Sequence, residues 1–158
     1  VFAVLVAISA FQTVTLQESA MEPTYSVGEK FFVNRALYKI SSPKRGDVIV
    51  FKTSASDSAA LHIRRVIGLP GETVQVKDGQ VYINGKVYEE NGAYQDMTDG
   101  GLADSAVTLE SGEYFVLGDN RNNSEDSRFS DIGNISKKYI VGKVWFTVSP
   151  KNKIGFIK

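Results

Sequence analysis

The sequence contains no cysteine and a single histidine, and its 18 basic residues are balanced by 18 acidic ones. The absence of cysteine excludes a disulfide framework, a zinc site built from thiolates and a cysteine nucleophile. The charges are interspersed and sum to zero, which is not the basic surface typical of nucleic-acid binding, so we expect no nucleic-acid partner. Any serine-histidine arrangement would have to use His62.

Apolar runs are short, and the clearest one is at the N-terminus, where residues 1–11 (VFAVLVAISAF) are apolar apart from Ser9. A helix needs about 20 such residues to cross a bilayer. We therefore interpret residues 1–12 as the C-terminal part of a membrane-anchor segment and residues 13–158 as one folded domain. A core strand or core helix is the alternative for the same run. A cleavable signal peptide is disfavoured because no Ala-x-Ala-like small residues close the run.

Helical patterns are nearly absent after Lys30, and short runs of β-branched and aromatic residues predict strands instead. Asp78-Gly79 and Asn84-Gly85 suit two-residue hairpin turns, so residues 74–88 predict a three-stranded meander. Residues from about 89 to 110 are rich in Gly, Asp, Ser and Asn, which favours a surface insertion over a part of the core. The expected strands lie at residues 31–33, 48–51, 114–117 and 141–148.

Three further segments carry motifs, namely residues 20–24 (AMEPT), 64–72 (RRVIGLPGE) and 118–128 (GDNRNNSEDSR). In order and separation they are similar to the three signature boxes of bacterial type I signal peptidases. Those boxes are Ser-Met-x-Pro-Thr, Lys-Arg-x-x-Gly-x-Pro-Gly-Asp and Gly-Asp-Asn-x-x-x-Ser-x-Asp-Ser-Arg. The resemblance extends from about Ala20 to Trp145, and the third box is the most specific of the three.

The resemblance implies a mostly β fold of coiled antiparallel sheets that follows the end of an N-terminal transmembrane helix. It also implies a membrane-anchored serine endopeptidase that removes signal peptides from exported preproteins after Ala-x-Ala-like sites, with no cofactor and no metal. The expected location is the cell membrane, crossed once, with the domain on the extracytoplasmic side. The expected partners are signal peptides and, through the N-terminal segment, the lipid bilayer.

In that family a serine hydroxyl attacks the scissile carbonyl and a neutral lysine amine takes its proton. This sequence has Ala20 at the serine position and Arg64 at the lysine position. A methyl group has no lone pair with which to attack, and a guanidinium does not give up its proton in a protein. We therefore expect the chain to be inactive.

Ser19 and His62 are the alternative candidates for a nucleophile and a base, and the sequence disfavours both. Ser19 would point away from the site if residues 19 and 20 lay on an extended segment, because neighbouring side chains there face opposite ways. His62 lies two residues before Arg64 and would share its strand face, although a lone histidine at a strand start is more often structural. By the resemblance, Met21 shields the base from water and Ser124 orients it, while core packing is the alternative for Met21.

The charges of the third box have a structural interpretation. Asp126 and Arg128 have the spacing of a pair on one side of an extended segment, and the resemblance implies that this pair holds the box against the second one. We expect Arg65 to complete a network with Asp126, and Arg64 to turn toward Asp126 because a buried guanidinium needs an acceptor. The alternative is a Gly-Asp-Asn turn with a solvated charge run.

Two interpretations of function remain open. The chain is either a processing protease disabled deliberately at both catalytic positions, or a natural signal-peptidase-like protein that binds an extended peptide or pilin-like partner in surface assembly without cutting it. Survival of Ser124, Asp126 and Arg128 favours the first, and replacement of both catalytic residues favours the second.

Overall fold

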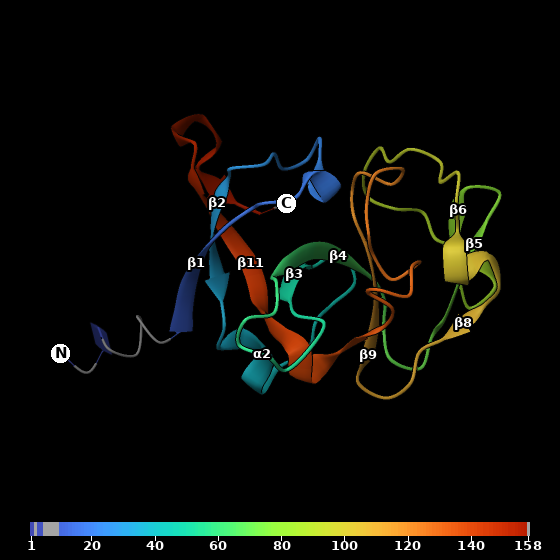
Figure 1. Ribbon diagram of the computed structural model, residues 1–158, viewed down its shortest axis with the longest axis horizontal. Helices are drawn as coiled ribbons and strands as arrows, with labels where there is room; N and C mark the ends of the chain where they lie inside the picture. The colour runs from blue at the N-terminus through green and yellow to red at the C-terminus, as the bar shows by residue number, and fades with distance from the viewer. Residues whose placement is uncertain (2, 5–9, 158) are drawn as a thin grey trace.

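Strands form where the sequence has its runs of β-branched and aromatic residues. The computed structural model describes the chain except for residues 2, 5–9 and 158 (Figure 1). Each predicted run lies in a strand, so the mostly β, antiparallel architecture is confirmed. These strands are β2 (Lys30–Asn34), β3 (Val48–Phe51), β9 (Glu113–Leu117) and β11 (Ile140–Ser149).

The larger sheet has the strand order β1-β2-β11-β3-β4-β9-β10, and β12 pairs with β11. Every pairing is antiparallel. In the register, Ile49 of β3 lies opposite Arg64, and Leu117 of β9 lies opposite Arg65. The second motif is therefore held on a central strand. The additional strands are β1 (Phe11–Thr15), β4 (His62–Gly68), β10 (Ile135–Ser136) and β12 (Gly155–Phe156).

Strands β3, β4 and β9 are covered on both faces, which explains the nearly continuous apolar sequences of β3 and β9, whereas β4 carries two arginines. Val48 and Val50 belong to one core cluster, whereas Ile49 and Phe51 belong to another on the opposite face. Alternate residues of a strand point to opposite faces, so each strand serves two cores. Any charged side chain on β4 must then find its partners inside the protein.

A smaller sheet with the order β7-β6-β5-β8 lies beside the larger one (Figure 1). Asp78 and Gly79 join β5 to β6 with φ angles of 52° and 77°, and Asn84 and Gly85 join β6 to β7 with 51° and 78°. Two successive positive φ angles define the predicted type of hairpin turn, so the meander is confirmed. The strands are β5 (Thr73–Lys77), β6 (Gln80–Ile83), β7 (Lys86–Val87) and β8 (Val107–Thr108).

The segment between residues 89 and 110 is largely irregular and exposed, with a short 3-10 helix η2 (Gly101–Asp104) and strand β8. Three of its side chains, Met97, Ala103 and Leu109, are buried in the core cluster that also holds Val74 and Phe115. The segment expected to form a surface insertion thus also covers the core of the smaller sheet.

The interpretation of residues 1–12 as part of a membrane anchor falls half on positions outside the described residues, namely 2 and 5–9. Among the residues that are described, no helix has the length and apolar character needed to span a bilayer. The other short helices that the structure describes in the domain are η1 (Ser19–Met21), α2 (Leu37–Ile40), η3 (Lys137–Tyr139) and η4 (Lys151–Lys153).

Candidate active site

The first and third motifs are held together by backbone contacts. The Asn120 amide N–H donates to the Ala20 carbonyl at 2.9 Å, and the Asn120 side chain donates to the Ser19 carbonyl at 3.1 Å. Gly118 lies at the closest approach, where a Cβ atom would come within 2.5 Å of the Ala20 carbonyl oxygen and 2.1 Å of Ser124 Oγ. Glycine at position 118 is therefore what allows η1 to lie against this loop.

The three motifs converge on one small cavity of about 190 Å³. Ala20, Arg64 and Ser124 all line it. Met21 does not line it: its side chain is fully buried in the core cluster with Tyr25 and Phe31. The lining residues are Glu18, Ser19, Ala20, Arg64, Asn123, Ser124 and Glu125.

Residues 19–21 form a 3-10 turn, not the extended segment that we assumed when we placed Ser19. Ser19 consequently lines the cavity beside Ala20 instead of pointing away from it. Its hydroxyl oxygen accepts a hydrogen bond from the Asn123 side-chain amide at 3.4 Å. An amide cannot act as a base, so this neighbour does not activate the Ser19 hydroxyl.

Arg64 is almost completely buried, with 1% of its surface exposed, and its guanidinium donates hydrogen bonds inside the protein. Its Nη1 donates to Glu18 Oε2 at 2.7 Å and to the Ile63 carbonyl at 2.7 Å, and its Nε donates to the Glu125 carbonyl at 2.7 Å. The expectation that Arg64 turns toward Asp126 is wrong. Both oxygens of Asp126 are already occupied by other donors, whereas the Glu18 carboxylate lies within reach.

Glu18 is the residue of this site that the sequence reasoning missed. Its two oxygens accept from Arg64 and from His62 Nδ1, the latter at 3.0 Å. Partial burial by itself raises the pKa of Glu18, but the hydrogen bonds from His62 and Arg64 outweigh it and lower the pKa from 4.5 to about 2. The sequence contained one indication of its role, because Glu18 is the first charged residue of the chain and lies two residues before the first motif.

Asp126 and Arg128 form the buried ion pair that their spacing predicted. Arg128 Nε and Nη2 each lie 2.9 Å from a different oxygen of Asp126. The Gly118 N–H and the Ser124 hydroxyl also donate to Asp126, at 3.0 and 2.8 Å. Because Asp126 is 0% exposed, the alternative of a solvated charge run is excluded.

Arg65 pairs with Asp119, not with Asp126 as we expected. Its Nε and Nη2 donate to the two Asp119 oxygens at 2.9 and 2.7 Å, and its Nη1 donates to the Gly46 carbonyl at 3.0 Å. Burial by itself lowers the pKa of Arg65, but the hydrogen bonds and charge of Asp119 outweigh it and raise the pKa above its ordinary value. Arg64 and Arg65 point to opposite faces of β4, so they cannot share one carboxylate.

A fourth buried arginine in the motif region, Arg121, was not singled out from the sequence. Its guanidinium donates to both oxygens of Glu90 at 2.6 and 2.5 Å and to the Gly118 carbonyl at 3.0 Å. It also lies over the Tyr94 ring, 4.1 Å from the centroid. The segment between residues 89 and 110 therefore helps to hold the third motif in place.

A second cavity of about 540 Å³ lies between β4 and the segment of residues 88–94. Pro23 and Thr24 of the first motif line it, together with Tyr88, Tyr94 and the Arg65–Asp119 pair. Within the described part of the chain, no three histidine or carboxylate side chains are grouped as a metal site would require.

Comparison with known proteins indicates the signal peptidases. Residues 1–149 match the family of signal peptidase, peptidase S26. The chain is 34% identical over 161 aligned positions to signal peptidase I of Bacillus licheniformis, covering 98% of this chain and 85% of that protein. It is 36% identical over 151 positions to signal peptidase I T of Bacillus subtilis strain 168, covering 91% and 77%.

A solved relative agrees with these similarities. The crystal structure of a signal peptidase I from Enterococcus faecalis V583 aligns with a TM-score of 0.51 at 32% identity, covering 66% of this chain and 98% of that one. The chain therefore belongs to the signal peptidase I family of serine endopeptidases. Signal peptidases act on the signal peptides of preproteins.

Proposed function

We propose that the chain is the peptide-binding domain of a type I signal peptidase in which the substitutions at Ala20 and Arg64 have removed the chemistry. The observation that carries this proposal is the site itself: both residues line one cavity with Ser124, in the arrangement that the family motifs imply. Neither side chain can supply a nucleophile or a base. The domain would act at the outer face of the cell membrane, anchored once by its N-terminal segment.

The cavities support binding of an extended peptide with small side chains. The small cavity beside Ala20 would take one small side chain of the peptide, and the larger cavity beside Pro23 and Thr24, which shares no lining residue with it, would take another part of the peptide. The networks of Asp126 and Asp119 keep the loop of the third motif in place without any catalytic residue. The peptide would be a signal peptide with an Ala-x-Ala-like end.

One observation favours a second candidate, a natural non-catalytic protein that binds an extended peptide or a pilin-like partner. Arg64 donates to three acceptors, including the Glu18 carboxylate, so the arginine is accommodated without a buried unpaired charge. Such compensation is what a chain adapted to arginine at position 64 would have.

The test is cleavage of one preprotein by four proteins: the unaltered chain, Ala20→Ser, Arg64→Lys and the double revertant. We expect cleavage by the double revertant alone, because nucleophile and base act as one unit. A double revertant that binds the preprotein but does not cut it would favour the second candidate. Cleavage by the unaltered chain would mean that Ser19 or His62 supplies the chemistry.

Glu18 makes the test sharper. A carboxylate beside a lysine amine favours the charged form, so Glu18 should raise the pKa of a lysine placed at position 64. Adding Glu18→Gln to the double revertant should therefore shift the rise of the cleavage rate to lower pH. A pH profile that does not move would show that the amine at position 64 is not the base.

A further inference from the structure

A separate cavity of about 600 Å³ lies between α2, the end of β3 and the start of β11. Arginine and lysine side chains line it, and no carboxylate does; Tyr38, Tyr139 and Ser54 add hydroxyl groups. We call this the basic cavity, defined by its cations Arg35, Lys39, Lys52, Lys137 and Lys138. A chain with zero net charge has thus gathered five of its 18 basic residues around one hollow.

The charges of the basic cavity are not neutralised by the protein. Within the part of the chain that the structure describes, none of its five cations forms an ion pair. Lys137 Nζ donates only to neutral acceptors, the Ser41 carbonyl at 3.0 Å and Ser42 Oγ at 3.2 Å. The Lys138 ammonium lies 4.9 Å from the centroid of the Tyr139 ring.

Asp47 contacts Tyr38, which lines the basic cavity, but its carboxylate already has partners. Asp47 accepts a hydrogen bond from the Tyr38 hydroxyl at 2.7 Å and pairs with Lys143 at 3.1 Å. Like charges around one cavity repel each other, and an anion placed among them relieves that repulsion. The basic cavity is therefore suited to an anion larger than a single small ion.

The position of the basic cavity indicates where the anion comes from. The backbone N–H of Arg35 donates to the backbone carbonyl of Ala10 at 2.8 Å, and Ala10 belongs to the apolar N-terminal run. Ile40, on α2, is 89% exposed, which places a large apolar side chain beside the cations. A basic group next to an apolar run and an exposed isoleucine is typical of a surface that meets anionic lipid.

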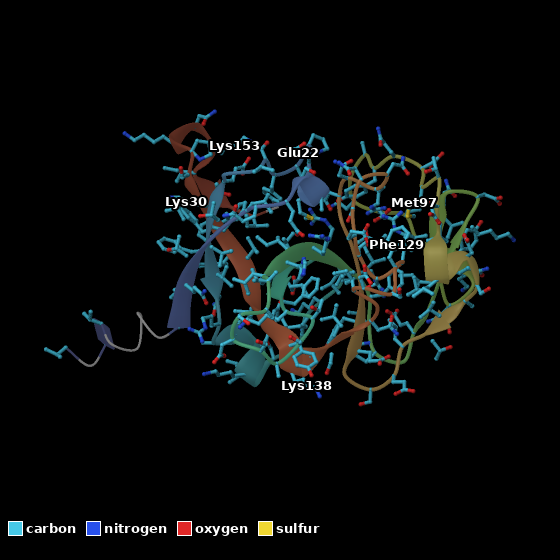
Figure 2. The ribbon with its side chains drawn as sticks, in the orientation of Figure 1. Glu22, Lys30, Met97, Phe129, Lys138 and Lys153 are labelled. Carbon is cyan, nitrogen blue, oxygen red and sulfur yellow. The ribbon has the colours of Figure 1, made fainter. Side chains whose placement is uncertain are left out.

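Figure 2 shows Lys138 at the lower end of the larger sheet, whereas Glu22 and Lys153 lie at the upper end. The basic cavity shares no residue with the cavity beside Ala20. It is thus a second site, and its occupant does not depend on whether the chain cuts peptides.

We propose that the basic cavity binds the phosphate-bearing headgroup of an anionic lipid. The lysines supply charge, Arg35 can donate two parallel hydrogen bonds to phosphate oxygens, and the tyrosine and serine hydroxyls add neutral donors. The contact would hold the domain in a fixed orientation at the membrane surface, beyond the tethering provided by the N-terminal run.

The experiment measures co-sedimentation of the full chain with two kinds of vesicle, pure phosphatidylcholine and equal parts phosphatidylcholine and phosphatidylglycerol. The test variant is Lys39→Gln/Lys52→Gln/Lys138→Gln. The matched control, Lys77→Gln/Lys86→Gln/Lys151→Gln, removes the same charge from exposed lysines outside the cavity. Each lysine at an anionic surface contributes about fivefold, so the test variant should lose on the order of a hundredfold in binding to the anionic vesicles.

Binding to pure phosphatidylcholine, which reports the apolar run, should be equal for all three proteins. Equal losses in the test and control variants would overturn the proposal, because net charge and not the cavity would then decide binding. A second experiment measures, by calorimetry, the binding of glycerol 1-phosphate to the chain in solution without vesicles. Tight binding of this ligand, with vesicle binding unaffected by the test variant, would identify a free phosphate compound as the occupant and overturn the lipid as its source.

Discussion

Glu18 Oε2 accepts a hydrogen bond from Arg64 Nη1 at 2.7 Å, across 46 residues of sequence, and this contact neutralises an arginine that is 1% exposed. We propose that Arg64 stands where the signal peptidases have their lysine base. On that proposal, the Glu18–Arg64 pair turns a position that needs a neutral amine into one half of a structural ion pair.

Replacing Glu18 with glutamine should destabilise the domain by about 1–2 kcal/mol. The change leaves the buried Arg64 without a countercharge, and the loss is moderated because about a third of the Glu18 side chain is exposed. The measurement is the midpoint of chemical denaturation, with Glu110→Gln, an exposed carboxylate, as the matched control. Combining Glu18→Gln with Arg64→Met should recover part of the loss, and no recovery would mean that the two residues are not coupled.

The same pair should make stability depend on pH in acid. The pKa of Glu18 is lowered from 4.5 to about 2, so the unfolded chain binds the proton more readily than the folded one. The stability from this group is fully present above pH 4.5 and is lost as the pH falls toward 2. Urea midpoints of the unaltered chain and of Glu18→Gln should converge as the pH is lowered through that window; a constant gap would contradict the assigned pKa.

Asp126→Ala should be among the most destabilising single substitutions in the domain, by about 3 kcal/mol or more. It leaves Arg128 buried without its carboxylate and removes the acceptor of the Gly118 N–H and the Ser124 hydroxyl. Asp131→Ala, on an exposed turn, provides the control for loss of one carboxylate. Equal denaturation midpoints for the two variants would count against a stabilising role for the network.

Glu90→Gln should cost about 1–3 kcal/mol, whereas the neighbouring exposed Glu89→Gln should cost close to nothing. Glu90 holds the buried Arg121 through two hydrogen bonds, although it lies in the segment that the sequence marks as an insertion. Denaturation midpoints of the two variants make a matched comparison one residue apart. If they agree, the segment between residues 89 and 110 does not support the third motif.

Local sequence determined much of the fold. Runs of β-branched and aromatic residues specify β2, β3, β9 and β11 because those side chains fit a pleated, buried surface. The Asp-Gly and Asn-Gly pairs specify the meander through backbone dihedral angles alone. The ion pair of Asp126 and Arg128 was equally predictable, because two-residue spacing brings the side chains together within one segment.

Tertiary structure alone decided the partners of Arg64 and Arg65. Asp119 lies 54 residues from Arg65, and Glu18 lies 46 residues from Arg64. The sequence offers 18 acidic residues, and spacing cannot choose among them across such distances. The choice follows from strand β4, which has cores on both faces and sends its two arginines in opposite directions, so each must pair with whichever carboxylate the fold brings to its own side.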